Sequence, residues 1–416
     1  MTGPRWVSVP EDLGAITQID AAAECAPWDA GMSTDGVERI WSAVELLYRT
    51  ATHPAITLVL RRKGKIVLKR AIGCLSGNIP GEDDAPLAPL NPDAPICLFS
   101  ASKAITALLL HKLVEDGKLR LEDRVCDHIP EFAAHGKDRV TIKQLLAHRA
   151  GIPALPIKHP DPALLQHWDA LVQLLCYAPP EDPRFEKQAY HALTSGFIVG
   201  ELVRRAGKIE LRDALRQWFA EPLKLGSMSY GLPQAQRAQS PRNAFTGPRP
   251  FWPLSMYVQR ILGVPFERAV QASNEDGYLS CVVPAGNIYA SADDVSRIFQ
   301  MLLNGGELDG VRVLRPETVA DAIKPVGKIQ YDGILMVPMR FSAGFMLGEN
   351  PFGIFGPRSS RAFGHLGFIS VLCWADPQRD ISVALLNTGK SVAPAGALAI
   401  ARLLGAISRS CPRVAD

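Results

Sequence analysis

The sequence has no long apolar run and no marked excess of charge of either sign. None of its apolar stretches reaches the ~20 residues that a membrane-spanning helix needs. Its 45 basic and 42 acidic residues leave a formal net charge of +3, which is too small to indicate nucleic-acid binding. We therefore expect neither a membrane nor a nucleic acid as a partner, whereas assembly into a homo-oligomer stays open.

Cysteine and histidine are present, but not in the spacings that bind metals. The eight cysteines form no CxxC pair or Cys/His cluster, and the nine histidines show no HExxH pattern. Buried free thiols fit this scatter better than a disulfide framework or a zinc site. The N-terminus also lacks a basic start followed by an apolar core, so no secretory signal is visible. We expect a cytoplasmic protein with no metal and no cofactor.

Strand-like patterns stand near both ends of the chain, with helical patterns between them. Residues 54–73 alternate apolar and polar residues on both sides of Lys63-Gly64, which predicts a β-hairpin. Residues 367–389 indicate two apolar strands around a turn. Helical spacing occupies 36–53, 192–208, 211–223, 291–306 and about 392–409.

These patterns predict an α+β fold. It would be an α/β sandwich whose antiparallel sheet is built from N- and C-terminal segments, with a mainly helical domain inserted in the middle. We expect 36–117 and 291–416 to form the discontinuous α/β domain and 118–290 the helical one, after an irregular leader over 1–35.

The stretch CLFSASKAITALLLHKL (97–113) places two serines and a lysine at the start of an apolar helix. On one helical turn, Ser100 and Lys103 share a face with about 5–6 Å between their Cβ atoms. A serine hydroxyl is a poor nucleophile until a base accepts its proton. Lysine serves as that base only if its pKa falls well below about 10.4, which an apolar setting favours. On this tetrapeptide alone, a helix cap is the better explanation of Ser100.

Two further motifs follow in order along the chain. Tyr190-His191-Ala192 stands just before the helical pattern of 192–208, and His365-Leu366-Gly367 opens the C-terminal strands. With Ser100-x-x-Lys103, they resemble the S-x-x-K, Y-x-N and K-T-G (or H-x-G) motifs of the serine β-lactamase and penicillin-recognising superfamily. The resemblance spans about residues 36–405. It is strongest to class C β-lactamases and the related family VIII carboxylesterases.

The resemblance implies a β-lactamase/transpeptidase-like fold and a set of roles. Ser100 would attack an acyl carbon, while Lys103 and Tyr190 share the proton as general base. Which of these two is the base in the resting enzyme stays open. Backbone N–H groups of Ser100 and Phe368 would hold the oxyanion. The resemblance further implies substrate contacts at His365, Leu366 and Gly367.

Departures from the family motifs bear on the substrate. Ala192 replaces the asparagine whose amide contacts the acylamide group of a β-lactam, and His365 and Leu366 replace the lysine and threonine that engage its carboxylate. We therefore expect a serine carboxylesterase for small, short-acyl esters, with weak lactam hydrolysis as a side activity. A β-lactamase, D-aminopeptidase or acyltransferase of the superfamily is the alternative, and a non-catalytic scaffold or ligand sensor is a third.

Several other residues have a structural and a functional interpretation. Trp252 and Tyr257, in a proline-broken aromatic stretch, are candidates for a wall of the substrate pocket. His148 is interpreted as a hydrogen-bonded structural residue. Asp293-Asp294 begins a helix, where carboxylates suit the helix dipole, and we interpret the pair as caps and not as a metal site.

Overall fold

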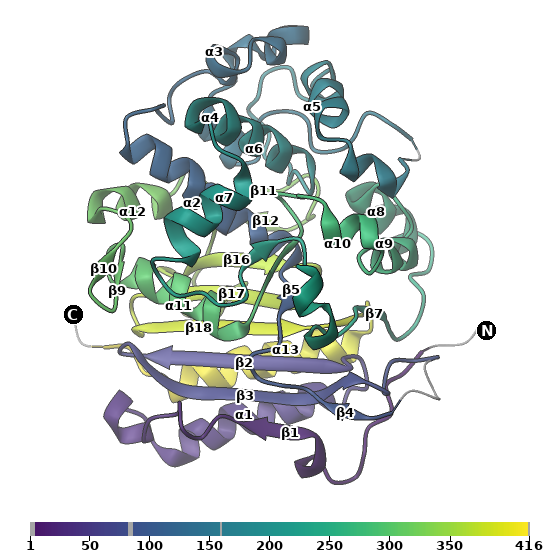
Figure 1. Ribbon diagram of the computed structural model, residues 1–416, viewed down its shortest axis with the longest axis vertical. Coiled ribbons are helices and arrows are strands. Elements are labelled where there is room, and N and C mark those ends of the chain that lie inside the picture. The colour runs from purple at the N-terminus through teal and green to yellow at the C-terminus, as the bar shows by residue number, and fades with distance from the viewer. Residues whose placement is uncertain (1–4, 82–85, 159, 415–416) are drawn as a thin grey trace.

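A computed structural model describes residues 5–81, 86–158 and 160–414, and an eight-stranded antiparallel sheet lies at its centre (Figure 1). The strand order is β1-β3-β2-β18-β17-β16-β13, and β4 pairs with β3. The strands are β1 (Thr17–Ile19), β2 (Ala55–Arg62), β3 (Lys65–Ser76), β4 (Ala88–Pro89), β13 (Met346–Leu347), β16 (Phe363–Gly367), β17 (Val371–Asp376) and β18 (Ile381–Asn387). The α+β prediction, with a sheet built from both ends of the chain, is confirmed.

The β2–β3 hairpin turns at the predicted place. Lys63 and Gly64 both have positive φ, of 50° and 75°, as a two-residue turn between right-twisted strands requires. β2 then pairs on its other side with β18, with Arg62 opposite Ile381 and Ile56 opposite Asn387. This pairing joins the two ends of the chain at the middle of the sheet.

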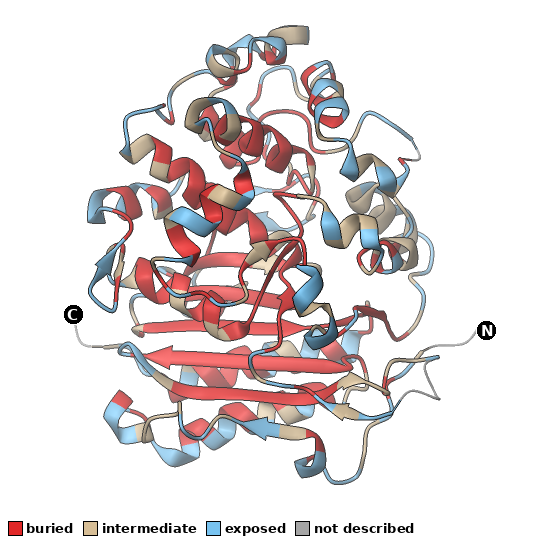
Figure 2. Cartoon of the chain, in the orientation of Figure 1, coloured by how far each residue is buried: buried red, intermediate tan, exposed pale blue. Residues whose placement is uncertain are grey.

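Both faces of the sheet are covered, which explains why its central strands are buried throughout and largely apolar. Along β18, Val383 and Leu385 pack with helices α1 (Thr34–Tyr48) and α13 (Pro394–Ser410), whereas Ala384 and Leu386 face α11 (Ala292–Leu303). α13 lies behind the sheet and α11 in front of it (Figure 1). The central strands are buried along their length (Figure 2), as strands covered on both faces are.

The helical part of the chain stands above the sheet in Figure 1. At its centre, α2 (Ser102–Glu115) packs against α6 (Thr194–Gly207). α2 is buried on nearly all sides, so it lacks a polar face. The remaining helices are α3 (Val125–His128), α4 (Ile142–Leu146), α5 (Trp168–Cys176), α7 (Leu211–Leu215), α8 (Leu254–Leu262), α9 (Phe266–Ala272), α10 (Asp276–Ser280) and α12 (Pro316–Ile323).

Short strands link the layers. β5 (Ile96–Cys97), β8 (Ile288–Ala290) and β6 (Ser229–Tyr230) form a three-stranded sheet, and β7 (Ala244–Phe245) pairs in parallel with β19 (Gly389–Lys390). The other two-stranded pairs are β9 (Glu307–Leu308) with β10 (Val311–Arg312), β11 (Gln330–Tyr331) with β12 (Pro338–Met339), and β14 (Phe352–Gly353) with β15 (Gly356–Pro357).

The described residues 5–35 differ from the irregular leader that the sequence predicts. Thr17–Ile19 forms the edge strand β1 beside β3, and Val7, Leu13 and Ile16 are buried against the core. All eight cysteines are free. Within the described ranges, no helix combines the length and apolarity that crossing a membrane would require.

Candidate active site

Ser100 lies in a tight turn between β5 and α2. The turn is a single 3-10 segment, Phe99–Ala101, and Phe99 has a φ of +46°, a left-handed conformation that costs a bulky residue energy. Ser100 does not cap α2, contrary to the simpler prediction, because Ala101 is the N-cap residue and no side chain caps it. The Ser100 hydroxyl instead contacts the side chains of Lys103 and Tyr190.

Lys103 reaches Ser100 from the first turn of α2. Its Nζ lies 3.2 Å from Ser100 Oγ, 2.6 Å from the Ala192 carbonyl oxygen and 3.1 Å from the Ala285 carbonyl oxygen. The side chain is buried, and this burial lowers the pKa of Lys103 well below its ordinary value of 10.5. No carboxylate pairs with Lys103 in the described part of the chain. The lysine thus meets the condition for a base that accepts the serine proton.

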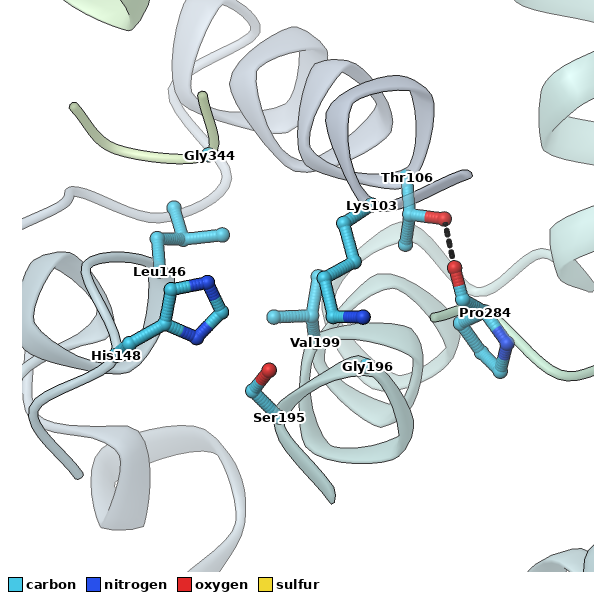
Figure 3. A pocket seen from close by; sticks show the side chains of 9 residues that line it. All are labelled: Lys103, Thr106, Leu146, His148, Ser195, Gly196, Val199, Pro284 and Gly344. Atoms are coloured by element: carbon cyan, nitrogen blue, oxygen red, sulfur yellow. Dashed lines mark hydrogen bonds between the residues drawn. The ribbon is translucent and has the colours of Figure 1, made fainter. Parts of the chain in front are cut away.

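A small cavity lies beside Lys103. Figure 3 shows the lysine stem between His148 and Leu146 on one side and Thr106 on the other. The cavity measures about 20 Å³, room for about one water molecule. Thr106 Oγ1 donates a hydrogen bond to the Pro284 carbonyl at 2.7 Å, the dashed line in Figure 3, which holds α2 against the segment that contains Ala285.

Tyr190 lies on the other side of Ser100, just before α6. Its ring centre is 4.9 Å from Lys103 Nζ, and its hydroxyl is hydrogen-bonded to Ser100. Burial raises the pKa of Tyr190 well above that of a solvated phenol, so the hydroxyl keeps its proton. The backbone N–H of Tyr190 donates to Asp332 Oδ1 at 3.0 Å, which ties the tyrosine to a buried carboxylate outside the three motifs.

Three buried histidines surround this cluster and are neutral at neutral pH. Burial lowers the pKa of His148 well below 6.5, that of His191 to about 4 and that of His365 to about 3. His148 packs on Tyr190 with ring centres 4.7 Å apart and accepts a hydrogen bond from the His191 backbone N–H. These contacts are the ones expected of a structural residue.

His365 lies at the start of the third motif, 6.1 Å from Tyr190 between ring centres. Its Nδ1–H donates to the Leu366 carbonyl at 2.6 Å, so Nε2 carries the lone pair. Nε2 is buried and makes no hydrogen bond within the described residues. His365 therefore has one buried acceptor available next to the tyrosine.

Strand β16 brings Phe368 beside the Ser100 turn. A Cβ on Gly367 would lie 2.1 Å from the Leu98 carbonyl oxygen, so this glycine allows close approach to the protein's own backbone. The substrate contact that the resemblance implies for Gly367 stays a prediction. After Gly367 the chain turns sharply, with φ of 25° at Phe368 and 78° at Ile369. The Phe368 ring packs on Phe99 with ring centres 5.0 Å apart.

A buried lysine, Lys390, lies behind Phe99 and was not identified from the sequence. Its Nζ is 4.8 Å from the centre of the Phe99 ring and donates to the Asn387 carbonyl at 2.9 Å. Burial lowers the pKa of Lys390 to about 7. A lysine directly after an apolar strand is the only sequence signal for such a residue, and many surface lysines share it.

A large apolar cavity of about 420 Å³ opens at Ser100. Tyr190, Ala192, Leu366 and Phe368 line it near the serine, and Tyr257 lines it from α8. Trp252 lies outside the cavity with 74% of its surface exposed, so the prediction of a pocket wall is wrong for this residue. The chain turns from the exposed Trp252 into α8, whose inner face then carries Tyr257.

Asp293 and Asp294 lie in the first turn of α11, as expected, but their partners are specific. Ser291 is the N-cap residue. Asp293 forms an ion pair with Arg61 of β2 at 2.6 Å, and Asp294 accepts hydrogen bonds from the backbone and side chain of Ser227. Both carboxylates hold neighbouring segments against the helix.

The comparisons with known proteins agree with this fold. The family model described as Beta-lactamase matches residues 44–406. Esterase/beta-lactamase LipL of Mycobacterium tuberculosis is 29% identical over 316 residues, which are 73% of this chain and 72% of the relative. The crystal structure of a penicillin-binding protein homologue from Caulobacter crescentus superposes with a TM-score of 0.79 at 27% identity, over 91% of this chain and 99% of that one. A family VIII carboxylesterase structure superposes with a TM-score of 0.77 at 24% identity, over 91% and 99%.

Proposed function

Because the chain belongs to the beta-lactamase family, we propose that it is a serine carboxylesterase that works through a covalent acyl-enzyme at Ser100. The observation that carries the proposal is the buried amine of Lys103, held 3.2 Å from Ser100 Oγ by two backbone carbonyls. A neutral lysine has two N–H donors and one lone pair. With the two donors on the carbonyls of Ala192 and Ala285, the lone pair is left for the serine proton.

In the acylation step, Ser100 Oγ bonds to the ester carbonyl carbon and its proton moves to Lys103 Nζ. The carbonyl π electrons move onto oxygen, where the backbone N–H groups of Ser100 and Phe368 stabilise the negative charge. The protonated Lys103 then has three acceptors around it, so its charge is solvated by fixed dipoles when it forms.

Tyr190 is suited to protonate the leaving group. Because its raised pKa keeps the phenol protonated, the hydroxyl can donate to the alkoxide as the C–O bond breaks, and Lys103 replaces that proton. Water then attacks the acyl carbon, transfers a proton by the same route in reverse, and releases Ser100 and the carboxylic acid. In this scheme Lys103, and not Tyr190, is the base of the resting enzyme.

The cavity supports an ester over a β-lactam. A β-lactam carries a carboxylate, yet among the described lining residues Asp161 is the one with a formal charge, and that charge is negative. Ala192 and Leu366 line the cavity without offering a side-chain hydrogen bond. The relative named Esterase/beta-lactamase LipL makes lactam hydrolysis the second candidate activity.

The test uses purified full-length protein with p-nitrophenyl butyrate and a chromogenic cephalosporin. We expect ester turnover that Ser100→Ala abolishes. Ser102→Ala should retain it, because Ser102 is fully buried and its hydroxyl accepts a hydrogen bond from the Ile288 backbone. Lactam turnover faster than ester turnover would contradict the carboxylesterase assignment. Absence of both would favour a non-catalytic scaffold or sensor.

A further inference from the structure

Helices α8 and α9 form one wall of the Ser100 cavity, and this wall is strongly apolar. α8 turns five apolar or aromatic side chains towards the cavity, and none of its residues is fully buried by the protein itself. These side chains are Leu254, Tyr257, Val258, Ile261 and Leu262. Figure 2 shows the contrast between this half-buried helix and the buried strands of the sheet. A molecule in the cavity would therefore cover apolar surface that the fold leaves open to solvent.

Apart from Ser100 and Tyr190, the hydroxyl groups of the described lining residues are already hydrogen-bonded within the protein. The Tyr257 hydroxyl donates to the Ile334 carbonyl at 2.5 Å, and the Tyr278 hydroxyl donates to the Gly286 carbonyl at 2.6 Å. The Ser273 hydroxyl donates to the Val270 carbonyl at 2.7 Å. Asp161 accepts the Ala163 backbone N–H at 2.9 Å and is exposed at the rim. A polar substrate group deep in this cavity would lose its hydration without gaining a partner there.

The size of the cavity exceeds what a short acyl group needs. Its volume of about 420 Å³ falls within the range of about 300–1,000 Å³ that small-molecule pockets occupy. An acetyl or butyryl group on Ser100 would leave most of this apolar space filled with water. The expectation of a small, short-acyl ester therefore finds no support in the geometry.

We propose that the site takes neutral esters with an apolar chain of roughly six to ten carbons, which lies along α8 and α9. This inference rests on the proposed esterase function and names its substrate class. The chain belongs either to the acid or to the alcohol of the ester, since the same apolar wall would bind it in both cases.

Two ester series separate the alternatives. One is p-nitrophenyl acetate to decanoate, in which the acid grows, and the other is methyl to decyl acetate, in which the alcohol grows. We expect kcat/KM to rise beyond butyrate or butyl by up to about fourfold for each buried methylene, in at least one series. The series that rises identifies the side of the ester that enters the cavity.

A variant of the wall tests the location. Val258→Trp places a large side chain in the cavity, and we expect the ratio of kcat/KM for octanoate to that for acetate to fall at least tenfold. Met256→Trp is the matched control, because Met256 lies on the same helix outside this cavity and is 63% exposed. The control should keep the ratio of the parent protein.

Each outcome bears on a different proposal. If both series decline beyond four carbons while butyrate is hydrolysed through Ser100, the chain-binding inference is overturned and the esterase stands. An equal loss of the ratio in Val258→Trp and Met256→Trp also overturns it. If no ester is hydrolysed in either series, the proposed function fails, and the inference fails with it.

Discussion

The substitution Gly367→Ala tests whether the close contact between β16 and the Ser100 turn positions the oxyanion donor. The added methyl would lie 2.1 Å from the Leu98 carbonyl oxygen, whereas real Cβ atoms essentially never approach closer than 3.0 Å. The strand must therefore move away from the turn by about 1 Å, and the Phe368 N–H that follows Gly367 moves with it. Lys103 lies on α2 and Tyr190 precedes α6, and we expect both to keep their positions.

Two costs follow from this displacement. Loss of one well-placed oxyanion donor lowers kcat by ~10²–10³. Overpacking at the crowded contact also lowers the free energy of unfolding, by about 1–3 kcal/mol. The assay is the initial rate of p-nitrophenyl butyrate hydrolysis, with urea unfolding of the same preparation to show that the protein is folded.

Gly364→Ala is the matched control on the same strand. Its methyl would lie 2.2 Å from the Cys373 carbonyl oxygen, so its steric conflict is as severe, but the conflict is with β17 and not with the Ser100 turn. We expect a similar loss of stability with activity within about fivefold of the parent protein. The reasoning is refuted if Gly367→Ala keeps its activity, or if Gly364→Ala loses as much activity as Gly367→Ala.

Two further predictions concern single side chains of the site. Tyr190→Phe removes the hydroxyl proposed to protonate the leaving group. It should slow acylation by an alkyl ester such as butyl acetate, whose alkoxide needs that proton, by ~10²–10⁴, measured as butanol release in a single turnover; a rate within twofold of the parent would show that Tyr190 is misassigned. Burial lowers the pKa of Lys390 to about 7 from its ordinary value of 10.5. Above pH 7 the unfolded chain therefore binds a proton at this lysine that the folded chain has lost. The free energy of unfolding then rises with pH, because the lysine destabilises the fold less. We therefore expect Lys390→Met to be more stable than the parent protein at pH 7. The difference in unfolding free energy between the two proteins should shrink by on the order of 1–3 kcal/mol between pH 7 and 9 in urea titrations. A constant difference would contradict the buried-lysine argument.

The regular elements could be predicted because their patterns are local. The alternation around Lys63-Gly64 encodes a hairpin that the structure contains, and the apolar run after Lys103 encodes the buried helix α2. The antiparallel sheet followed from strand patterns near both ends of the chain. The bounds expected for the two domains and the roles of the motif residues stay predictions.

Other parts of the site depend on backbone positions, which residue types do not reveal. The carbonyls of Ala192 and Ala285 bind Lys103, yet any residue type supplies a carbonyl at those positions. The substrate contact expected at Gly367 stays a prediction, and the neighbour that requires a glycine there is Leu98, far away in the sequence. Trp252 and Tyr257 stand in one aromatic stretch, and only the path of the chain into α8 separates the exposed residue from the cavity wall.

The pairing of β2 with β18 has a consequence for how the protein is made. β2 leaves the ribosome before its partner Ile381–Asn387, and the long stretch of chain between the two strands is synthesised in the interval. At about 5–20 residues per second, the free edge of β2 waits on the order of tens of seconds for that partner. During this time an apolar strand edge can pair with another nascent chain, so protection by chaperones matters most before β18 emerges. Strand β18 thus also decides when the sheet can close.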